Sequence, residues 1–505
     1  MPRTRSAGHE IVLIVDSLAV GIIQYPHMAS TSTGTTSGAR LRRTLTLWDL
    51  ILYGVIVIQP VAPMSVFGVL SDRGHGHVVT TILIAMVAML FTAISYGRMA
   101  RAYPSAGSAF TYVGQEINPA LGYVTGWSMV MDYMLNPMIC IIWISQQAHV
   151  FAPGVPYGAW AVFFALVFTA LNIQGVKTSA RVNTALAAGM GVVIAIFFVA
   201  AARYIFGNPH DGAAFFTRPF YDPETWNTRA VLGGTSVAVL TYIGFDGIST
   251  LSEEAENPRR NILLATVLTC LVIGVLSAVE VYAAQLVWPA SQPYPNMDTA
   301  FTFVAGRAWK PLFAIIGFTL VVANFGSGMG AQLGAARLLY GMGRSSALPK
   351  SFFGVVDAKR HVPRNNVLFV GALALAGAFF LPWVAAVPSR VLGFLTSGYG
   401  KDLGTTTSGY ELGANLLNFG ALIAFMGVNA AAFVRYYLHE KEKKLSNLLP
   451  PVLGFVICLF LWLNLSTMAL IFGVIWMAAG IAFGAWKTKG FRGNLVDFEL
   501  PPEES

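Results

Sequence analysis

The chain has 505 residues, of which 55% are hydrophobic and only 11% are charged, and its mean hydropathy is +0.62. A soluble core cannot bury that many apolar side chains, so the composition excludes an ordinary soluble protein and predicts an integral membrane protein. The formal net charge of +8 does not indicate a nucleic-acid binder. The basic residues are dispersed through short loops, where lipid headgroups account for them better.

The first 45 residues are expected to form a cytoplasmic tail. Within them, the apolar stretch 10–23 contains Asp16 and is too short to span a membrane. A cleaved signal peptide would leave the mature N-terminus outside, which disagrees with the charge distribution described below. Met28 opens a stretch rich in Ser, Thr and Gly, and we hypothesise that translation begins there.

Twelve stretches are long and apolar enough to cross a membrane, since a spanning helix needs about 20 mostly apolar residues. If the N-terminus lies in the cytoplasm, cytoplasmic segments carry 24 of the 32 Lys and Arg residues and outer loops carry 8. Cytoplasmic loops normally hold the positive excess, so both termini are predicted to be cytoplasmic. The predicted spans are 46–70, 78–98, 119–149, 158–176, 182–206, 230–253, 262–289, 311–336, 367–388, 411–436, 448–465 and 468–486.

Two of these spans are interrupted near mid-membrane. The first contains Gln59-Pro60-Val61-Ala62-Pro63, through which a regular helix cannot run, and the sixth contains Gly244-Phe245-Asp246-Gly247. Freed backbone groups are tolerated in a membrane only where protein or a polar cavity meets them. If spans one to five and six to ten are repeats, the breaks correspond, and the odd number of spans makes the repeats inverted. A lone kink would be structural, but two in register are typical of a secondary transporter with its site at the breaks.

Three acidic residues lie deep within the spans, where an ionised side chain costs roughly 2.5–3.5 kcal/mol on insertion scales. Asp246 is expected to be a gate or cation contact, a cap of the second half-helix, or both. Asp132 has Asn136 one turn away on the same face of the third span, and this face is expected to line a cavity. Glu280, in the seventh span, either carries a proton during the cycle or is a protonated core residue.

Other polar features favour less specific interpretations. Asn324 and Ser327 lie on a glycine-rich face of the eighth span, which fits an ion site or, more simply, close helix packing. No Lys or Arg lies in the fifth span before Arg203, so no internal ammonium stands in for sodium there. The segment Ser252–Arg260 mixes acidic and basic residues and is expected to be a solvated loop, with an inner-gate salt bridge as the alternative.

No constellation of catalytic residues is present in the sequence. It contains no GxxxxGK[ST] motif for ATP and no HExxH motif for zinc,. The three cysteines, Cys140, Cys270 and Cys458, all lie within predicted spans and are interpreted as core residues rather than disulfides or metal ligands. We therefore expect no enzyme activity, no cofactor and no metal.

Two segments resemble signatures of the amino acid–polyamine–organocation superfamily of transporters. They are Gly244–Asn261 (GFDGISTLSEEAENPRRN) and Tyr96–Val113 (YGRMARAYPSAGSAFTYV). The resemblance runs from Leu41 to about Gly490. Four segments are similar to the bacterial putrescine importer group, namely FTAISYG, INPALGYVTGWSMVMDY, ARLLYGMGR and NFGALIAFMGVN. It implies an all-α membrane protein of twelve transmembrane helices. A leucine-transporter-type 5+5 inverted-repeat core would occupy 46–437 and two peripheral helices 438–487, between cytoplasmic tails at 1–45 and 488–505.

The resemblance also implies where a substrate binds, between spans one, three, six, eight and ten. Asp246 falls where related exchangers place a gating glutamate. Asp132, next to Tyr133, falls near where those exchangers contact a distal guanidinium. The contacts implied at the two breaks are Val61, Ala62, Pro63, Met64 and Ser65 in the first and Thr241, Ile243 and Gly244 in the second.

The first break departs from the glycine-rich sequence of amino acid permeases, because QPVAPMSVFG stands in its place. This modestly favours an amine without a carboxylate, although Asp132 and Asp246 have acidic counterparts in relatives with varied substrates. Residues 397–413 also differ from the importer pattern as an insertion in an outer loop.

The expected function is therefore that of a permease in a bacterial inner membrane. It would import amino acids or polyamines such as putrescine by proton symport and alternating access, with Asp246 or Glu280 as the coupling carboxylate. The expected partners are the small-molecule substrate, protons and membrane lipid, but no nucleic acid. The alternatives are an exchanger of an amino acid for its amine and, more remotely, a non-transporting nutrient receptor.

Overall fold

The computed structural model describes residues 45–103, 108–174, 180–252, 255–344, 348–357, 360, 362–386, 408–440, 443–488 and 490. Within these ranges the chain is helical, and an isolated bridge joins Leu45 to Ala255. The hypothetical start at Met28, nearly all of both tails, the acidic pair of the 252–260 loop and most of the 397–413 insertion lie outside the described residues.

Eleven helices in the described ranges are long and apolar enough to cross a membrane, and the bent pair α2–α3 brings the number to twelve. This confirms the predicted all-α class and the number of spans. The first five spans are α2 (Leu47–Ile58) with α3 (Ala62–Arg73), α4 (Val78–Ala102), α6 (Pro119–Phe151), α7 (Tyr157–Gln174) and α8 (Ala180–Gly207).

The second half begins with a span built from three pieces. These are α10 (Thr228–Ala238) and the short 3-10 helices η1 (Val239–Thr241) and η2 (Phe245–Leu251). The remaining spans are α11 (Pro258–Val287), α13 (Leu312–Arg344), α15 (Arg364–Ala386), α17 (Gly409–Phe433) with its π-helical end η3 (Val434–Leu438), α18 (Leu445–Leu463) and α19 (Thr467–Lys487). Short helices in the connections are α5 (Ser108–Glu116), α9 (Gly212–Thr217), α12 (Ala300–Ala308) and α14 (Lys350–Phe353).

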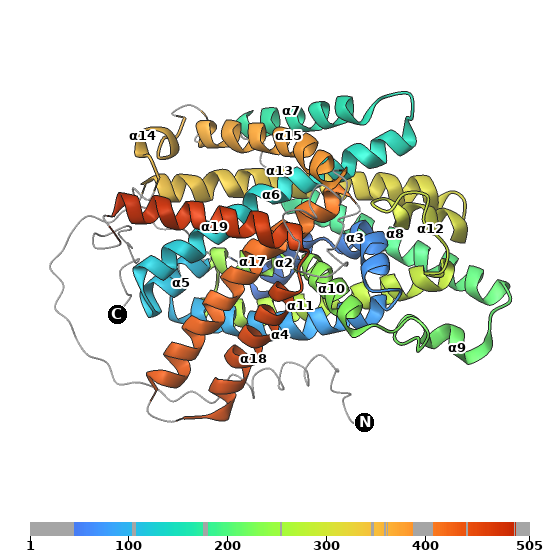
Figure 1. The fold of residues 1–505 in the computed structure, drawn as a ribbon, viewed down its shortest axis with the longest axis horizontal. Helices are drawn as coiled ribbons and strands as arrows, with labels where there is room; N and C mark the ends of the chain where they lie inside the picture. Colours follow the sequence, from blue (N-terminus) through green and yellow to red (C-terminus); the bar gives the residue numbers. More distant parts are fainter. Residues whose placement is uncertain are drawn as a thin grey trace, which may run out of the picture.

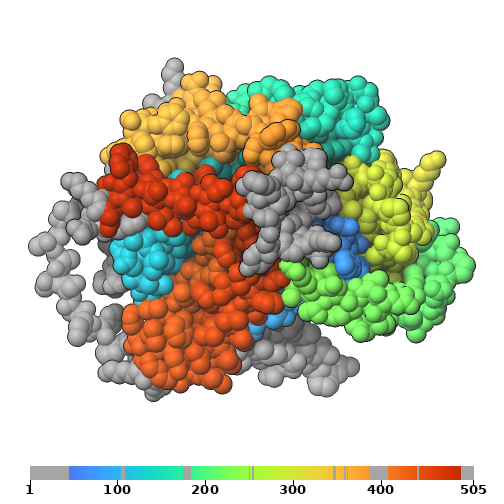
Figure 2. Space-filling model, in the orientation of Figure 1, coloured from blue at the N-terminus to red at the C-terminus, as the bar shows by residue number. Residues whose placement is uncertain are grey.

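Corresponding helices of the two halves pack against each other at the centre. The third and eighth spans, α6 and α13, each have 33 residues and are in contact, as are α4 and α11. Gly97 permits the second contact, because a Cβ there would lie 2.5 Å from the Cα of Leu263,. By contrast, only 22% of the apolar 18-residue segment of α18 is buried within the protein, against 83% of the corresponding segment of α6. Figure 2 shows α18 and α19 as an outer layer on one face.

Successive spans alternate in direction, so the bundle has two ends. We call the end at which α2 begins the tail side and the end at which α3 ends the far side. The short helices α5 and α14 lie on the tail side, at the left of Figure 1, whereas α9 and α12 lie on the far side, at the right.

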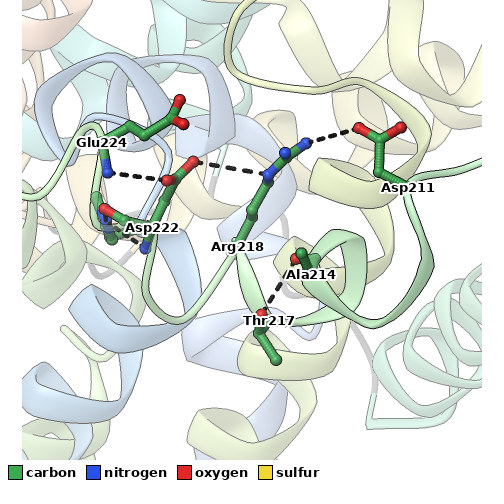
Figure 3. A network of polar contacts seen from close by, with 7 residues as sticks. Asp211, Ala214, Thr217, Arg218, Asp222 and Glu224 are labelled. Atoms are coloured by element: carbon green, nitrogen blue, oxygen red, sulfur yellow. Dashed lines mark hydrogen bonds and ion pairs between the residues drawn. The ribbon is translucent and has the colours of Figure 1, made fainter.

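The connection between α8 and α10 is fastened to the far-side end of α4. The backbone N–H of Asp222 donates to Nε2 of His77, which is buried at the start of α4, over 3.1 Å. Arg218 lies between the carboxylates of Asp211 (3.4 Å) and Asp222 (3.8 Å), as Figure 3 shows. These contacts hold the start of the second repeat beside the second span.

Candidate functional site at the two broken helices

The first break bends the span by 46° between α2 and α3. The α2 helix ends at Ile58. Gln59 does not continue it, because a residue before proline is disfavoured in the α region, and it adopts φ 71° instead. Its side-chain amide donates to the carbonyl of Ala323 on α13 over 2.5 Å. This hydrogen bond fastens the break to the eighth span.

The N-terminus of α3 has few free backbone donors. The N–H of Ala62 is bonded to the carbonyl of Gln59 and that of Met64 to the carbonyl of Val61, each over 3.1 Å. Pro63 has no N–H. A helix N-terminus binds anions through such groups, so none of the first three residues of α3 offers an N–H to a substrate carboxylate.

The second break starts earlier than the sequence indicated. The regular α-helix of α10 already ends at Ala238, and the chain continues as 3-10 turns on either side of Gly244 rather than as a second α-helix. Gly244 has φ 123°, a conformation that residues with a side chain rarely adopt. The interruption predicted at Gly244–Gly247 is therefore the second part of a longer irregular segment.

Asp246 is held by the backbone of this break. Its carboxylate accepts the N–H of Gly244 over 3.2 Å and a hydrogen bond from the Tyr133 hydroxyl on α6. The side chain is only 4% exposed. The N-cap of η2 is Gly244 and has no side-chain cap hydrogen bond, so the cap and gate interpretations of Asp246 both stay predictions. The hydrogen bond with Tyr133 makes the carboxylate face the third span.

Asp132 on α6 lies close enough to Asp246 for the two charges to interact. It is 5% exposed, and among the described residues neither carboxylate forms an ion pair with Lys, Arg or His. Two buried carboxylates without a cationic partner are costly when ionised. Their arrangement is therefore suited to a ligand that brings positive charge.

Aromatic side chains surround these carboxylates. Tyr96 on α4 interacts electrostatically with both, and its ring meets Phe245 and Phe425 edge-on at 5.5 and 5.8 Å. Its buried hydroxyl has no hydrogen-bond partner in the described part of the chain. Tyr53 lies beside Gly247, where a Cβ would be 3.9 Å from its hydroxyl. Aromatic faces attract ammonium groups.

Tyr53 and Tyr96 were not among the predicted site residues. Tyr96 lies in the FTAISYG and YGRMARAYPSAGSAFTYV segments, so its place in two recognised motifs was a usable signal. No comparable pattern marked Tyr53 on α2.

The eighth span meets the first break through side chains. The Asn324 amide donates to the Ser65 hydroxyl over 3.0 Å, and the Trp143 indole on α6 donates to the Ser65 carbonyl over 3.1 Å. Ser327, by contrast, forms a hydrogen bond with the thiol of Cys140. This thiol donates to the side-chain oxygen of Asn136 over 3.4 Å. Asn136 and Ser327 therefore lie at the contact between α6 and α13, and Asn324 at the break.

The other expected contact residues lie around the two breaks. Val61, Met64 and Thr241 are almost fully buried, whereas Ile243 and Gly244 are partly exposed. Glu280 lies on α11 rather than in either break. It is fully buried, and neither carboxyl oxygen has a hydrogen-bond partner among the described residues.

Polar contacts close the bundle at both ends. On the tail side, the hydroxyls of Ser108 on α5 and Ser249 on η2 are 3.0 Å apart. Glu116 there binds Arg435 over 3.0 Å. On the far side, Arg73 of α3 is 2.5 Å from Glu411 of α17. These contacts join different helices at each end of the bundle.

Comparisons with known proteins agree with this architecture. The family profile "Amino acid permease" matches residues 61–498. The low-affinity putrescine importer PlaP of Escherichia coli (strain K12) is 34% identical over 481 residues, covering 94% of this chain and 99% of that protein. The branched-chain amino acid permease BcaP of Bacillus subtilis (strain 168) is 25% identical and covers 88% of this chain and 93% of its own. The methylthioribose transporter of the same organism is also 25% identical, with coverages of 89% and 94%.

Proposed function

Since the chain belongs to the amino acid permease family and is a membrane transporter rather than an enzyme, we propose that it imports an aliphatic diamine such as putrescine together with a proton. The substrate binds between the two breaks, and alternating access exposes this site to each side of the membrane in turn. The observation that carries the proposal is the pair of buried carboxylates, Asp132 and Asp246, whose charges interact and have no cationic partner among the described residues.

The α3 N-terminus supports an amine over an amino acid. Ala62 and Met64 use their N–H groups within the break, and Pro63 has none. A substrate carboxylate would therefore leave its charge unpaired in a buried site, which is costly. An ammonium group instead meets Asp246 and the ring faces of Tyr96 and Tyr133. The name of the 34% identical relative, a putrescine importer, points the same way.

The orientation follows from the distribution of basic residues. We place the tail side in the cytoplasm of a bacterial cell and the far side outside the inner membrane, with both termini cytoplasmic, because 24 of the 32 Lys and Arg residues then lie inside,. Residues 46–437 form the transport core, and the two helices within 438–487 are peripheral to it. Membrane lipid surrounds the protein, and no nucleic acid takes part.

Two carboxylates are candidates for the coupled proton. Asp246 contacts the substrate site directly, whereas Glu280 is fully buried and has no hydrogen-bond partner in the described ranges. An unpaired carboxyl at this depth is stable only when it is protonated. If Glu280 carries the coupled proton, Glu280→Gln abolishes accumulation driven by the proton gradient but preserves exchange between labelled and unlabelled putrescine. Intact accumulation in this variant would assign coupling to Asp246.

The test of the function is uptake into liposomes that contain the purified full-length protein. With an inward proton gradient, we expect saturable accumulation of labelled putrescine that a protonophore abolishes. A mixture of labelled amino acids, tested in parallel, should enter at a much lower rate. Uptake of amino acids alone would overturn the diamine proposal.

An exchanger is distinguished in the same liposomes. Uptake that requires unlabelled substrate inside the liposomes and does not depend on the proton gradient would show that the protein is an exchanger and not a proton symporter. Binding of putrescine without any flux under either condition would indicate a receptor.

A further inference from the structure

A polar network on the far side connects the first break to the end of α17. Arg73 at the end of α3 pairs with Glu411 in the first turn of α17 over 2.5 Å. The hydroxyl of Ser408, the N-cap of α17, accepts the N–H of Glu411 over 3.1 Å and donates its proton to Asp298 over 2.6 Å. Asp298 lies between α11 and α12 and is 5% exposed.

The same network reaches the substrate site through one tryptophan. The indole N–H of Trp143 on α6 is shared between the carbonyl of Ser65, in the first turn of α3, and the carbonyl of Asp298, at 3.1 and 2.8 Å. The segment that holds Asp298 also packs directly on α3, because a Cβ at Gly68 would overlap the carbonyl of Met297. A movement of α3 therefore changes the surroundings of Asp298.

The titratable groups that interact with Asp298 come from two helices. Glu411 and Tyr410 belong to α17, and Tyr157 belongs to α7; each interacts with it electrostatically. Arg73 of α3 is bound to Glu411 rather than to Asp298. Among the described residues, no cation forms an ion pair with this carboxylate.

We propose that Asp298 is a proton-binding residue of the far-side gate, so that protonation of its carboxyl group favours the closed arrangement in which α3, α12 and α17 meet. This inference rests on the proposed function for its place in transport, since a proton taken up from outside then closes the gate behind the substrate. When the gate opens, α3 separates from α17, water reaches Asp298, and the hydrogen bond from Ser408 breaks.

The direction of the pH effect follows from linkage. Burial raises the pKa of Asp298 to about 6, and the charge of Glu411 adds to this, while the hydrogen bond from Ser408 opposes it. In the open gate the carboxyl is hydrated and its pKa returns towards the ordinary value of 3.8. The closed gate thus binds the proton more tightly, and the ratio of closed to open protein should rise about tenfold between pH 7 and pH 5.

The test measures the gate distance directly in the full-length protein in liposomes. Spin labels on His75→Cys, in the turn after α3, and Val155→Cys, in the turn after α6, report far-side opening; both positions are exposed, and the three native cysteines are buried. We expect the longer-distance population to fall as the pH is lowered from 7 to 5. In Asp298→Asn this dependence should disappear. The proposal is overturned if the variant keeps the same pH dependence, or if the labelled protein with Asp298 intact shows no pH dependence.

A second variant separates titration from structural damage. Ser408→Ala removes a hydrogen bond that favours the ionised carboxylate, so the midpoint of the pH dependence should move upwards while the transition itself remains. A midpoint that stays in place or moves down contradicts the proposal. Asp211→Asn is the matched control, because Asp211 is an exposed far-side carboxylate outside the network, and its midpoint should not change.

The measurement needs no substrate, so its outcome is independent of the proposed function. A pH-dependent gate distance with no putrescine uptake would reject the substrate and retain Asp298 as a gate residue. Putrescine uptake with a gate distance that does not change with pH would retain the substrate and reject Asp298 as a gate residue.

Discussion

The two broken spans differ in where their polar groups are directed. In the first break, prolines remove N–H groups, the N–H groups of Ala62 and Met64 are bonded locally, and the Gln59 and Ser65 side chains are bonded to α13. The second break presents a carboxylate, Asp246, to the third span. Inverted repeats therefore share an architecture without sharing chemistry. We expect the second break to recognise charge and the first to form a neutral wall.

The largest effect should come from neutralising the second break. Asp246→Asn removes one member of a buried charge pair formed with the substrate, which costs roughly 3–5 kcal/mol, so putrescine uptake should fall on the order of 100-fold or more. Initial rates in liposomes measure this, with Asp211→Asn as the control. An uptake rate within threefold of that of the unmodified protein would show that the second break does not recognise the charge of the substrate.

The backbone of the second break gives the next effect. Gly244→Ala places a Cβ 3.0 Å from Val57 at φ 123°, which costs about 1–3 kcal/mol, so the melting temperature in detergent should fall by several degrees. Gly191→Ala is the matched control, because nothing lies within 4 Å of a Cβ there. Equal melting temperatures for the two variants would show that the break relaxes freely.

The first break should respond through Gln59. Both Gln59→Ala and Gln59→Gly remove the hydrogen bond to Ala323, at a cost of roughly 1–3 kcal/mol for the buried acceptor. Only the glycine variant relieves the positive φ of 71°, so it should be the more stable of the two by about 1 kcal/mol. Chemical denaturation of the purified variants measures the difference, and the reverse order would show that φ is not strained.

The smallest effect should come from Pro63→Ala. This change restores one N–H at the start of α3 and hardly alters putrescine uptake. It should strengthen competition by ornithine, a diamine that carries a carboxylate, by a few-fold, since one additional hydrogen bond contributes about 1 kcal/mol. Competition assays with excess ornithine measure this. Unchanged competition would show that the lack of free N–H groups at the first break is not what disfavours carboxylates.

Several parts of the site followed from local sequence and others did not. Both breaks were recognisable because Pro and Gly act on their own backbone. The start of the second break was misplaced, because nothing in residues 238–243 forbids a helix and packing decides its form there. Asp132 and Asp246 were recognisable because acidic residues deep in a span are rare, whereas a tyrosine such as Tyr53 is common in any apolar helix.

The sequence by itself determined that this is a twelve-span membrane protein with two interrupted helices, because hydropathy and backbone chemistry are local properties. Only the tertiary structure decided which groups meet. It brings Asp132 towards Asp246, joins Gln59 to Ala323, buries Glu280 without a hydrogen-bond partner among the described residues, and collects Arg73, Asp298 and Glu411 at one end. These contacts connect residues far apart in the chain, and their geometry depends on the packing of whole helices, which no local pattern encodes.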